Sequence, residues 1–261
     1  MRIVIKIGTS TLAHATGKLN IKRTGELCKV VSDLKNAGHE TILVSSGAIG
    51  MGVGKLGLHE KPTDIPTKQA AAAVGQCELM YTYDRLFAEY GHTVAQILLT
   101  GSDFTAEDRH ENFTNTLFRL LELGALPIIN ENDTIATEEI KVGDNDTLSA
   151  LVAVSVKADL LVILSDVDGL YSADPHKDPN AKLIEEVYGV DEKIIALAGG
   201  VGSALGTGGM KTKLKAAKIC AEANCDTVIA NGETPDLLYN MVDGKKGGYT
   251  RFFATETEDG Q

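Results

Sequence analysis

Short runs of β-branched and aliphatic residues alternate along the chain with longer stretches in which apolar residues recur every three or four positions. The short runs predict strands and the longer stretches predict helices. The predicted strands cover residues 2–7, 41–45, 93–99, 126–130, 160–165 and 227–230. The predicted helices cover residues 22–36, 67–90, 112–123, 147–156 and 212–222. This alternation is typical of a parallel sheet with helices on both faces, so the sequence predicts an α/β fold.

Most of the predicted strands end directly in small or polar residues. Gly8 to Ser10 follow the first strand, Ser45 to Gly47 end the second, and Asn130 to Asp133 end the fourth. In an open parallel sheet, ligands bind beyond the carboxyl ends of the strands. We therefore expect these strand ends to converge on one site.

Composition narrows the class of protein. The chain has 261 residues and a formal net charge of -11, which leaves no basic field to hold a nucleic acid or an anionic membrane. No apolar run approaches the roughly 20 residues that span a bilayer, and the N-terminus has no signal-peptide pattern. We expect a cytoplasmic protein with reduced thiols.

The metal-binding residue types are scattered. No two of the four cysteines have CxxC spacing, and we expect all four to be buried as small hydrophobic side chains. No two of the six histidines have metal-ligand spacing. The sequence therefore assigns neither a catalytic histidine nor a metal ligand from the protein.

The chain has no internal repeat or low-complexity linker, which predicts one domain over residues 1–253 and a polar tail over residues 254–261. The segment 132–143 lacks a long apolar stripe, and Glu138 to Val142 fit one arm of a small hairpin. Such a hairpin can act as a lid over a substrate, but the sequence does not decide whether it moves.

Glycine turns follow the first two strands. Lys6 precedes Gly8, and this pair suits a phosphate because glycine allows close approach of backbone amides while lysine supplies a compact positive charge. Alternatively, Lys6 is an exposed lysine at a strand end. Ser46 and Gly47 precede a helix start whose amides suit a carboxylate or a phosphate, unless Ser46 only caps that helix.

Two clusters of amides and carboxylates lie a short loop apart. One runs from Asn130 to Thr134 and the other from Gly143 to Thr147, at the start of a helix. Carboxylates accept hydrogen bonds from ammonium groups and amides donate to carboxylates, so the clusters suit an amino acid. Alternatively, Asp144 only caps the helix. A calcium loop is disfavoured because the spacing does not match an EF-hand.

Two further motifs suit a nucleotide. Ser165 and Asp166 end the fifth strand, while Asp168 and Gly169 beyond them fit a tight turn. The segment from Gly206 to Lys213 is a glycine-rich loop that leads into a helix. It lacks the GK[ST] ending of a P-loop but offers amides and lysines to a triphosphate, and a plain hinge is the alternative.

In this order, the motifs resemble those of the amino-acid kinase family and, within it, the glutamate 5-kinases. The resemblance implies a three-layer αβα sandwich of the carbamate kinase-like type with a mainly parallel sheet. It places the phosphate acceptor over the N-terminal half and ATP with Mg²⁺ over the C-terminal half. The implied reaction is ATP-dependent phosphorylation of the γ-carboxylate of L-glutamate, the first step of proline biosynthesis.

The resemblance also implies residue roles. Lys6 and Lys213 flank the transferring phosphoryl group, and Asp146 holds both lysines in place. The implied substrate-binding residues are Ser46, Gly47, Asp133 and Asn145. The implied nucleotide-binding residues are Lys6, Gly8, Ser165, Asp166, Thr207, Gly208, Gly209, Met210, Lys211, Thr212 and Lys213. A glutamate carboxylate is already an anion at neutral pH, so the reaction needs positioning and charge neutralisation rather than a general base.

Family membership implies a homodimer or homotetramer and feedback inhibition by proline, neither of which is readable from the residues. Many bacterial members carry an additional C-terminal domain of the PUA type, which this sequence is too short to include, and its effect on assembly and metal response stays open.

Two alternatives to this function remain. An N-acetylglutamate kinase also makes an acyl phosphate but needs no pocket for an ammonium group. A non-catalytic amino-acid or nucleotide sensor on the same fold could lack Lys6, Asp146 or Lys213, yet all three are present.

Overall fold

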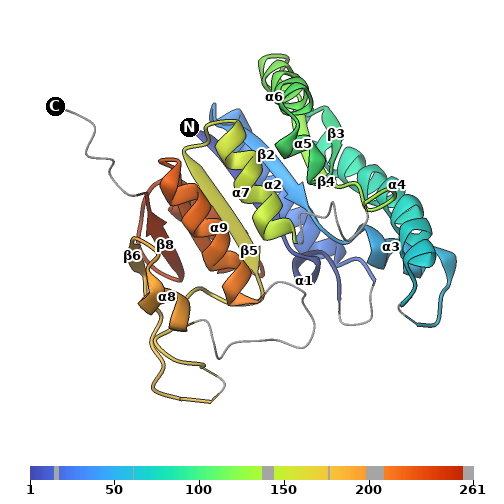
Figure 1. The fold of residues 1–261 in the computed structure, drawn as a ribbon. Coiled ribbons are helices and arrows are strands. Elements are labelled where there is room, and N and C mark those ends of the chain that lie inside the picture. Colours follow the sequence, from blue (N-terminus) through green and yellow to red (C-terminus); the bar gives the residue numbers. More distant parts are fainter. Residues whose placement is uncertain (15–17, 61, 137–143, 176, 198–208, 255–261) are drawn as a thin grey trace.

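The computed structural model describes residues 1–14, 18–60, 62–136, 144–175, 177–197 and 209–254 (Figure 1). The strands of these residues form a single sheet in the order β3-β4-β2-β1-β5-β7-β8-β6. Neighbouring strands pair in parallel except β7 and β8, which are antiparallel. The strands are β1 (Arg2–Ile7), β2 (Glu40–Ser45), β3 (Val94–Leu99), β4 (Leu126–Glu131), β5 (Leu160–Ser165), β6 (Glu186–Tyr188), β7 (Asp226–Asn231) and β8 (Tyr249–Phe253).

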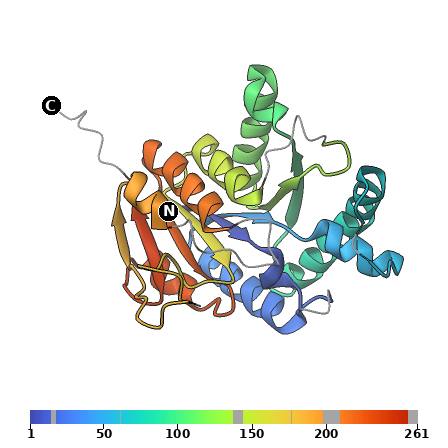
Figure 2. The ribbon, with the colours of Figure 1, turned by 60° about the horizontal axis from the view of Figure 1, so that its bottom comes forward.

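Helices cover both faces of this sheet. The helices are α1 (Thr9–Leu12), α2 (Ile21–Asn36), α3 (Ala48–Leu56), α4 (Ile65–Ala88), α5 (Ser102–Thr105), α6 (Glu107–Glu122), α7 (Asn145–Ser155), α8 (Glu192–Leu197), α9 (Met210–Glu222) and α10 (Leu237–Val242). Buried residues of α6, α7 and α9 pack on one face, and those of α2, α4 and α10 pack on the other. Figure 2 shows α7 and α9 on one side of the sheet and α2 on the opposite side. The predicted three-layer αβα sandwich with a mainly parallel sheet is therefore confirmed.

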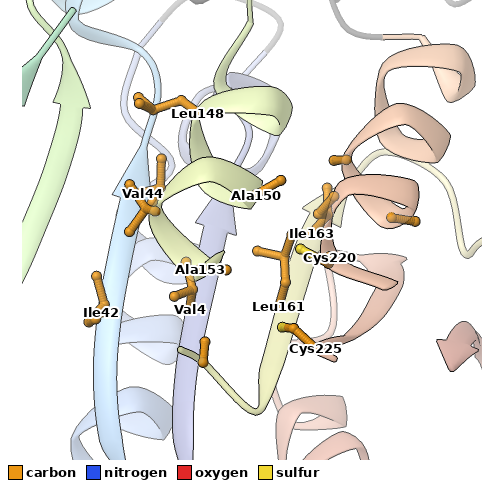
Figure 3. Close-up of a cluster of buried hydrophobic side chains, with 14 of the residues drawn as sticks. Val4, Ile42, Val44, Leu148, Ala150, Ala153, Leu161, Ile163, Cys220 and Cys225 are labelled. Atoms are coloured by element: carbon orange, nitrogen blue, oxygen red, sulfur yellow. The ribbon is translucent and has the colours of Figure 1, made fainter. Parts of the chain in front are cut away.

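The central strands are buried on both faces, which explains their nearly continuous apolar sequence. In β1, Val4 faces the core under α7 and α9, while its neighbours Ile3 and Ile5 face the core under α2 and α4. Figure 3 shows Val4, Val44 and Ile163 beneath α7 and α9. This double burial fixes the register of the strands and hence the positions of their carboxyl ends.

The elements predicted from the apolar pattern are all present, with ends that differ by at most five residues. The strands β6 and β8 were not predicted. They are short, and they depend on partners far along the chain, since β8 pairs with β7 and β6 pairs with β8. Thr250 in β8 adds a hydrogen bond from its hydroxyl to the Ile184 carbonyl oxygen at 2.7 Å.

The expectation of four buried cysteines is wrong for Cys77, which lies on the solvent-facing side of α4. The other three are buried. Cys220 and Cys225 lie where α9 ends, and the Cys225 amide donates to the Cys220 carbonyl oxygen at 3.0 Å around Asn224, which has a φ of 58°. Their contact is the apolar one that often accompanies a left-handed helix terminus, and Figure 3 shows both side chains in the core.

The helices α3 and α4 pack backbone against backbone. A Cβ atom added to Gly52 would lie 1.8 Å from the Ala71 carbonyl oxygen, and one added to Gly75 would lie 1.7 Å from the Ala48 carbonyl oxygen. Only glycine allows such an approach. The contact fixes the start of α3 beside the end of β2, where the predicted site lies.

None of the helices in the described ranges is both long and apolar enough to cross a membrane.

Candidate active site

Two buried lysines and one buried aspartate meet at the carboxyl end of the sheet. The Asp146 carboxylate lies 2.7 Å from Lys6 Nζ through Oδ1 and 3.2 Å from Lys213 Nζ through Oδ2. Lys6 is 8% exposed, Asp146 1% and Lys213 3%. Lys6 is therefore not the exposed strand-end lysine that the sequence left as an alternative. Together the three charges leave one net positive charge in a largely buried site.

Local structure brings these side chains together from three elements. Lys6 comes from the end of β1. Asp144 caps α7 by accepting from the Thr147 amide at 2.7 Å, as one interpretation of the sequence proposed, and this places Asp146 in the first turn. Lys213 lies in the first turns of α9, and Thr212 beside it donates to Asp146 Oδ2 at 2.7 Å. Asp146 therefore joins the first turn of α7 to the first turns of α9.

The environment of Asp146 sets its protonation state. Burial raises the pKa of the Asp146 carboxyl, but the charges of Lys6 and Lys213, with hydrogen bonds from Lys6 and Thr212, lower it by more. The net result is a pKa below the usual value for aspartate. Asp146 is therefore an anion at neutral pH and cannot act as a general acid there.

This shift predicts a pH dependence of stability. Because the pKa of Asp146 is lower in the folded state, ionised Asp146 stabilises the fold above its unfolded pKa of about 4, and the contribution is lost as the pH falls through the folded value. We expect the free energy of unfolding of the wild type to fall below pH ~4 more steeply than that of Asp146→Asn, which cannot titrate. Urea unfolding between pH 2.5 and 6 measures both slopes. Parallel slopes would contradict the ion-paired state of Asp146.

Asn145, in the first turn of α7, connects the ends of strands β2 and β4. Its Nδ2 lies within hydrogen-bond distance of the Ser45 carbonyl oxygen at 3.0 Å, Ser46 Oγ at 2.8 Å and Asn130 Oδ1 at 3.1 Å. Helix α3 begins after Gly47, which has a φ of 102° and serves as its N-cap. Ser46 thus makes a contact with Asn145 instead of capping α3, so the capping alternative is wrong. Asp133 lies half-buried just beyond β4, at the same edge of the sheet.

The residues predicted for the nucleotide lie around the other side of Lys6. A Cβ atom on Gly8 would lie 3.3 Å from the Leu164 carbonyl oxygen and 3.7 Å from Lys6 Nζ, so glycine keeps the space beside the lysine open. Ser165 donates to Asp166 Oδ1 at 3.0 Å at the end of β5. Asp168 accepts hydrogen bonds from Tyr171 and Asn231, both at 2.9 Å. These contacts stabilise the turn after β5.

The start of α9 also belongs to the predicted nucleotide side of the site. Among the described residues, no side chain caps its first turn after Gly209, so those amides suit an anion. Lys211 is exposed, whereas the Met210 side chain is packed in the core. Thr207 and Gly208, which were also predicted to contact the nucleotide, lie outside the described residues. So does most of the predicted lid, residues 137–143.

The described part of the chain contains no group of three or more His, Cys, Asp or Glu side chains arranged to hold a metal ion. Mg²⁺ commonly keeps several waters and binds through substrate phosphates rather than through a protein cage. The open space at Gly8 and the uncapped amides of α9 fit a triphosphate that brings its own Mg²⁺.

Three contacting residues were given no role by the sequence prediction. Asn130 was noted in a motif but given no role, and Gln76 and Tyr83 of α4 were taken as part of an apolar helix. Tyr83 lies 2.8 Å from Ser45 Oγ through its hydroxyl group. Thr212 was expected at the nucleotide, but its hydroxyl contacts Asp146. The available signal was weak, because α4 carries several other polar side chains and nothing in its sequence distinguishes Gln76 and Tyr83 from them.

Comparison with known proteins agrees with this geometry. The model of the amino acid kinase family matches residues 1–231. A glutamate 5-kinase of Clostridium tetani is 55% identical over 246 residues, covering 94% of this chain and 92% of that protein. A glutamate 5-kinase of Caldanaerobacter subterraneus is 52% identical and covers 96% of this chain and 67% of that protein.

Among solved structures, carbamate kinase from Giardia lamblia bound to AMP-PNP superposes with a TM-score of 0.67 at 19% identity, covering 97% of this chain and 98% of that chain. At this identity the likeness shows the fold alone. The sequence matches are much closer and extend over nearly the whole length of the Clostridium tetani protein. The chain therefore belongs to the amino-acid kinase family and, within it, to the glutamate 5-kinases.

Proposed function

We propose that the protein transfers the γ-phosphoryl group of ATP to the side-chain carboxylate of L-glutamate and releases L-glutamyl 5-phosphate and ADP. The observation that carries this proposal is the buried cluster of Lys6, Asp146 and Lys213 beside the amide and hydroxyl groups of Asn145 and Ser46. Close relatives that are themselves glutamate 5-kinases support the choice of acceptor.

The polarity of the acceptor side favours a free amino acid. The Asn145 amino group is engaged by the Ser45 carbonyl oxygen and by Ser46, so the amide oxygen of Asn145 is the part that can contact a substrate, and it can only accept hydrogen bonds. Ser46 Oγ accepts from Asn145, so its hydroxyl proton can be donated to a carboxylate. With Asp133 nearby, these groups suit an α-ammonium and an α-carboxylate. An N-acetylated substrate would lack the ammonium.

The reaction itself requires little covalent chemistry from the protein. The glutamate carboxylate attacks the γ-phosphorus, the bond to the β-phosphate oxygen breaks, and negative charge spreads over the phosphoryl oxygens. Lys6 and Lys213 would neutralise that charge, because both ammonium groups are buried beside Asp146 at the carboxyl end of the sheet. Asp146 holds the two lysines at fixed positions. Mg²⁺ bound to ATP would add to the same neutralisation.

Turnover in the presence of hydroxylamine tests this function, because an acyl phosphate is trapped as a hydroxamate. Purified protein is incubated with ATP, Mg²⁺ and one acceptor, either L-glutamate, N-acetyl-L-glutamate or L-aspartate. We expect hydroxamate with L-glutamate only. Product with N-acetylglutamate or aspartate would retain the reaction but change the acceptor. No product with any acceptor would favour a sensor on the same fold.

Alanine substitution should separate the acceptor side from the nucleotide side. We expect Asp133→Ala and Asn145→Ala each to raise the KM for glutamate about tenfold or more, with little change in the KM for ATP. The reason is that one hydrogen bond to a charged substrate group contributes about 1.5–3 kcal/mol. Initial rates with each substrate varied in turn provide both constants. An equal rise in both KM values would remove these residues from the acceptor site.

Assembly into a homodimer or homotetramer and inhibition by proline stay predictions from family membership. Size-exclusion chromatography with light scattering, and turnover with added proline, measure them independently of the acceptor.

A further inference from the structure

A chain of side-chain amides runs from the acceptor side of the site to the edge of the sheet. Asn145 Nδ2 lies 3.1 Å from Asn130 Oδ1, Asn130 Nδ2 donates to Gln76 Oε1 at 3.0 Å, and Gln76 Nε2 donates to Gln96 Oε1 at 3.0 Å. The four residues belong to α7, β4, α4 and β3, so the chain crosses the sheet between elements far apart in the sequence.

The two middle residues of this series of hydrogen-bonded amides are buried. Asn130 is 2% exposed and Gln76 is 7% exposed, whereas Gln96 on the edge strand is exposed. Asn130 Oδ1 also accepts from the Glu131 amide at 2.9 Å, so the side-chain hydrogen bonds of Asn130 all depend on one amide orientation. A buried amide that loses an acceptor must move or admit water, because leaving a donor unsatisfied is costly.

We infer that Gln76 is a positioning residue for the acceptor site, which acts through Asn130 to hold Asn145 in the orientation that presents its amide oxygen to the substrate ammonium. Gln76 does not contact Asn145 directly, because Asn130 lies between them, and it touches no reacting atom. This inference rests on the proposed function, because it concerns the acceptor that Asn145 contacts. Two turns further along α4, Tyr83 makes a comparable contact, since its hydroxyl lies 2.8 Å from Ser45 Oγ.

The substitution Gln76→Met tests the inference, because methionine has a similar length and no hydrogen-bond acceptor of comparable strength. We expect the KM for glutamate to rise about tenfold, with the KM for ATP unchanged and kcat within a few-fold of the wild type. Gln76→Glu keeps an acceptor for Asn130 Nδ2, and Gln96 at the exposed edge can rotate its amide to donate. We therefore expect Gln76→Glu to restore most of the wild-type KM.

Gln69 is the matched control, because it lies two turns earlier on α4 and its side chain forms no hydrogen bond with the described residues. We expect Gln69→Met to leave both KM values unchanged. Gln96→Met should have a smaller effect than Gln76→Met, since water can replace an exposed oxygen.

Two outcomes would overturn the inference. One is an unchanged KM for glutamate in Gln76→Met, and the other is a fall in kcat and thermal midpoint with both KM values constant, which indicates a structural role alone. Wild-type turnover with glutamate tests the proposed function separately. Failure of the proposed function would appear as no hydroxamate from the wild type. Failure of the inference would appear as an active Gln76→Met variant whose KM for glutamate equals that of the wild type.

Discussion

Lys213→Met should lower kcat by about 10²–10³-fold, while the KM for glutamate changes little. The ammonium of Lys213 is buried and held by Asp146, so it is ready to meet charge that develops on the phosphoryl group. Removing one such preorganised donor typically costs two to three orders of magnitude in kcat. Without Lys213, the remaining pair of Lys6 and Asp146 carries no net charge. Steady-state kinetics of protein shown by circular dichroism to be folded measures the effect.

Lys215→Met provides the control on the same helix. Lys215 is exposed and lies two residues beyond Lys213, so it receives the same substitution without touching the buried cluster. We expect wild-type kinetics from this variant. A kcat within about threefold of the wild type in Lys213→Met would show that Lys213 balances the buried charge of Asp146 without taking part in phosphoryl transfer.

Gly75→Ala should destabilise the fold by about 3 kcal/mol, at the upper end of the usual range for overpacking. The new Cβ would lie 1.7 Å from the Ala48 carbonyl oxygen and 2.4 Å from the Gly52 nitrogen, and neither backbone atom can move without shifting α3. Because α3 begins beside Ser46, the shift should also raise the KM for glutamate. Urea unfolding with linear extrapolation measures the stability change.

Gly54→Ala makes the same substitution in the partner helix α3, where no heavy atom of the described residues lies within 4 Å of the new Cβ. We expect Gly54→Ala to stabilise the protein by roughly 0.5–1 kcal/mol, because alanine favours the helix and restricts the unfolded chain. Similar effects from both substitutions would mean that α3 and α4 can separate without cost, which is contrary to their backbone contact.

The central sheet was predictable because its strands are buried on both faces and therefore read as nearly continuous apolar runs that end in glycine or polar residues. The rule for carboxyl ends then predicted that Gly8, Ser46 and Asn130 lie at one edge of the sheet, whereas the roles of Lys6, Asn145 and Asp146 followed from the family resemblance. By contrast, β8 was not predictable, since its five residues are held by pairing with β7 rather than by a pattern of their own.

Two features of the candidate site also depended on tertiary structure. A hydroxyl at Ser46 suits both a helix cap and a ligand contact, and the choice follows from the left-handed conformation of Gly47, which makes that glycine the N-cap of α3. Gln76 has no periodic signal, because its partner Asn130 lies 54 residues away in sequence. Contacts of this kind arise from packing between elements, and a linear pattern does not encode them.

The central claim is that the side-chain carboxylate of glutamate attacks the γ-phosphorus of ATP between Lys6 and Lys213. The most direct test uses L-glutamate labelled with ¹⁸O in its side-chain carboxylate, together with ATP, Mg²⁺ and hydroxylamine. Attack by the carboxylate places one labelled oxygen in the bond to phosphorus, and hydroxylamine then releases it as phosphate. We expect one ¹⁸O per phosphate, in amounts equal to the hydroxamate, by mass spectrometry. Phosphate without label would show that water, not the carboxylate, is the nucleophile, and would contradict this account.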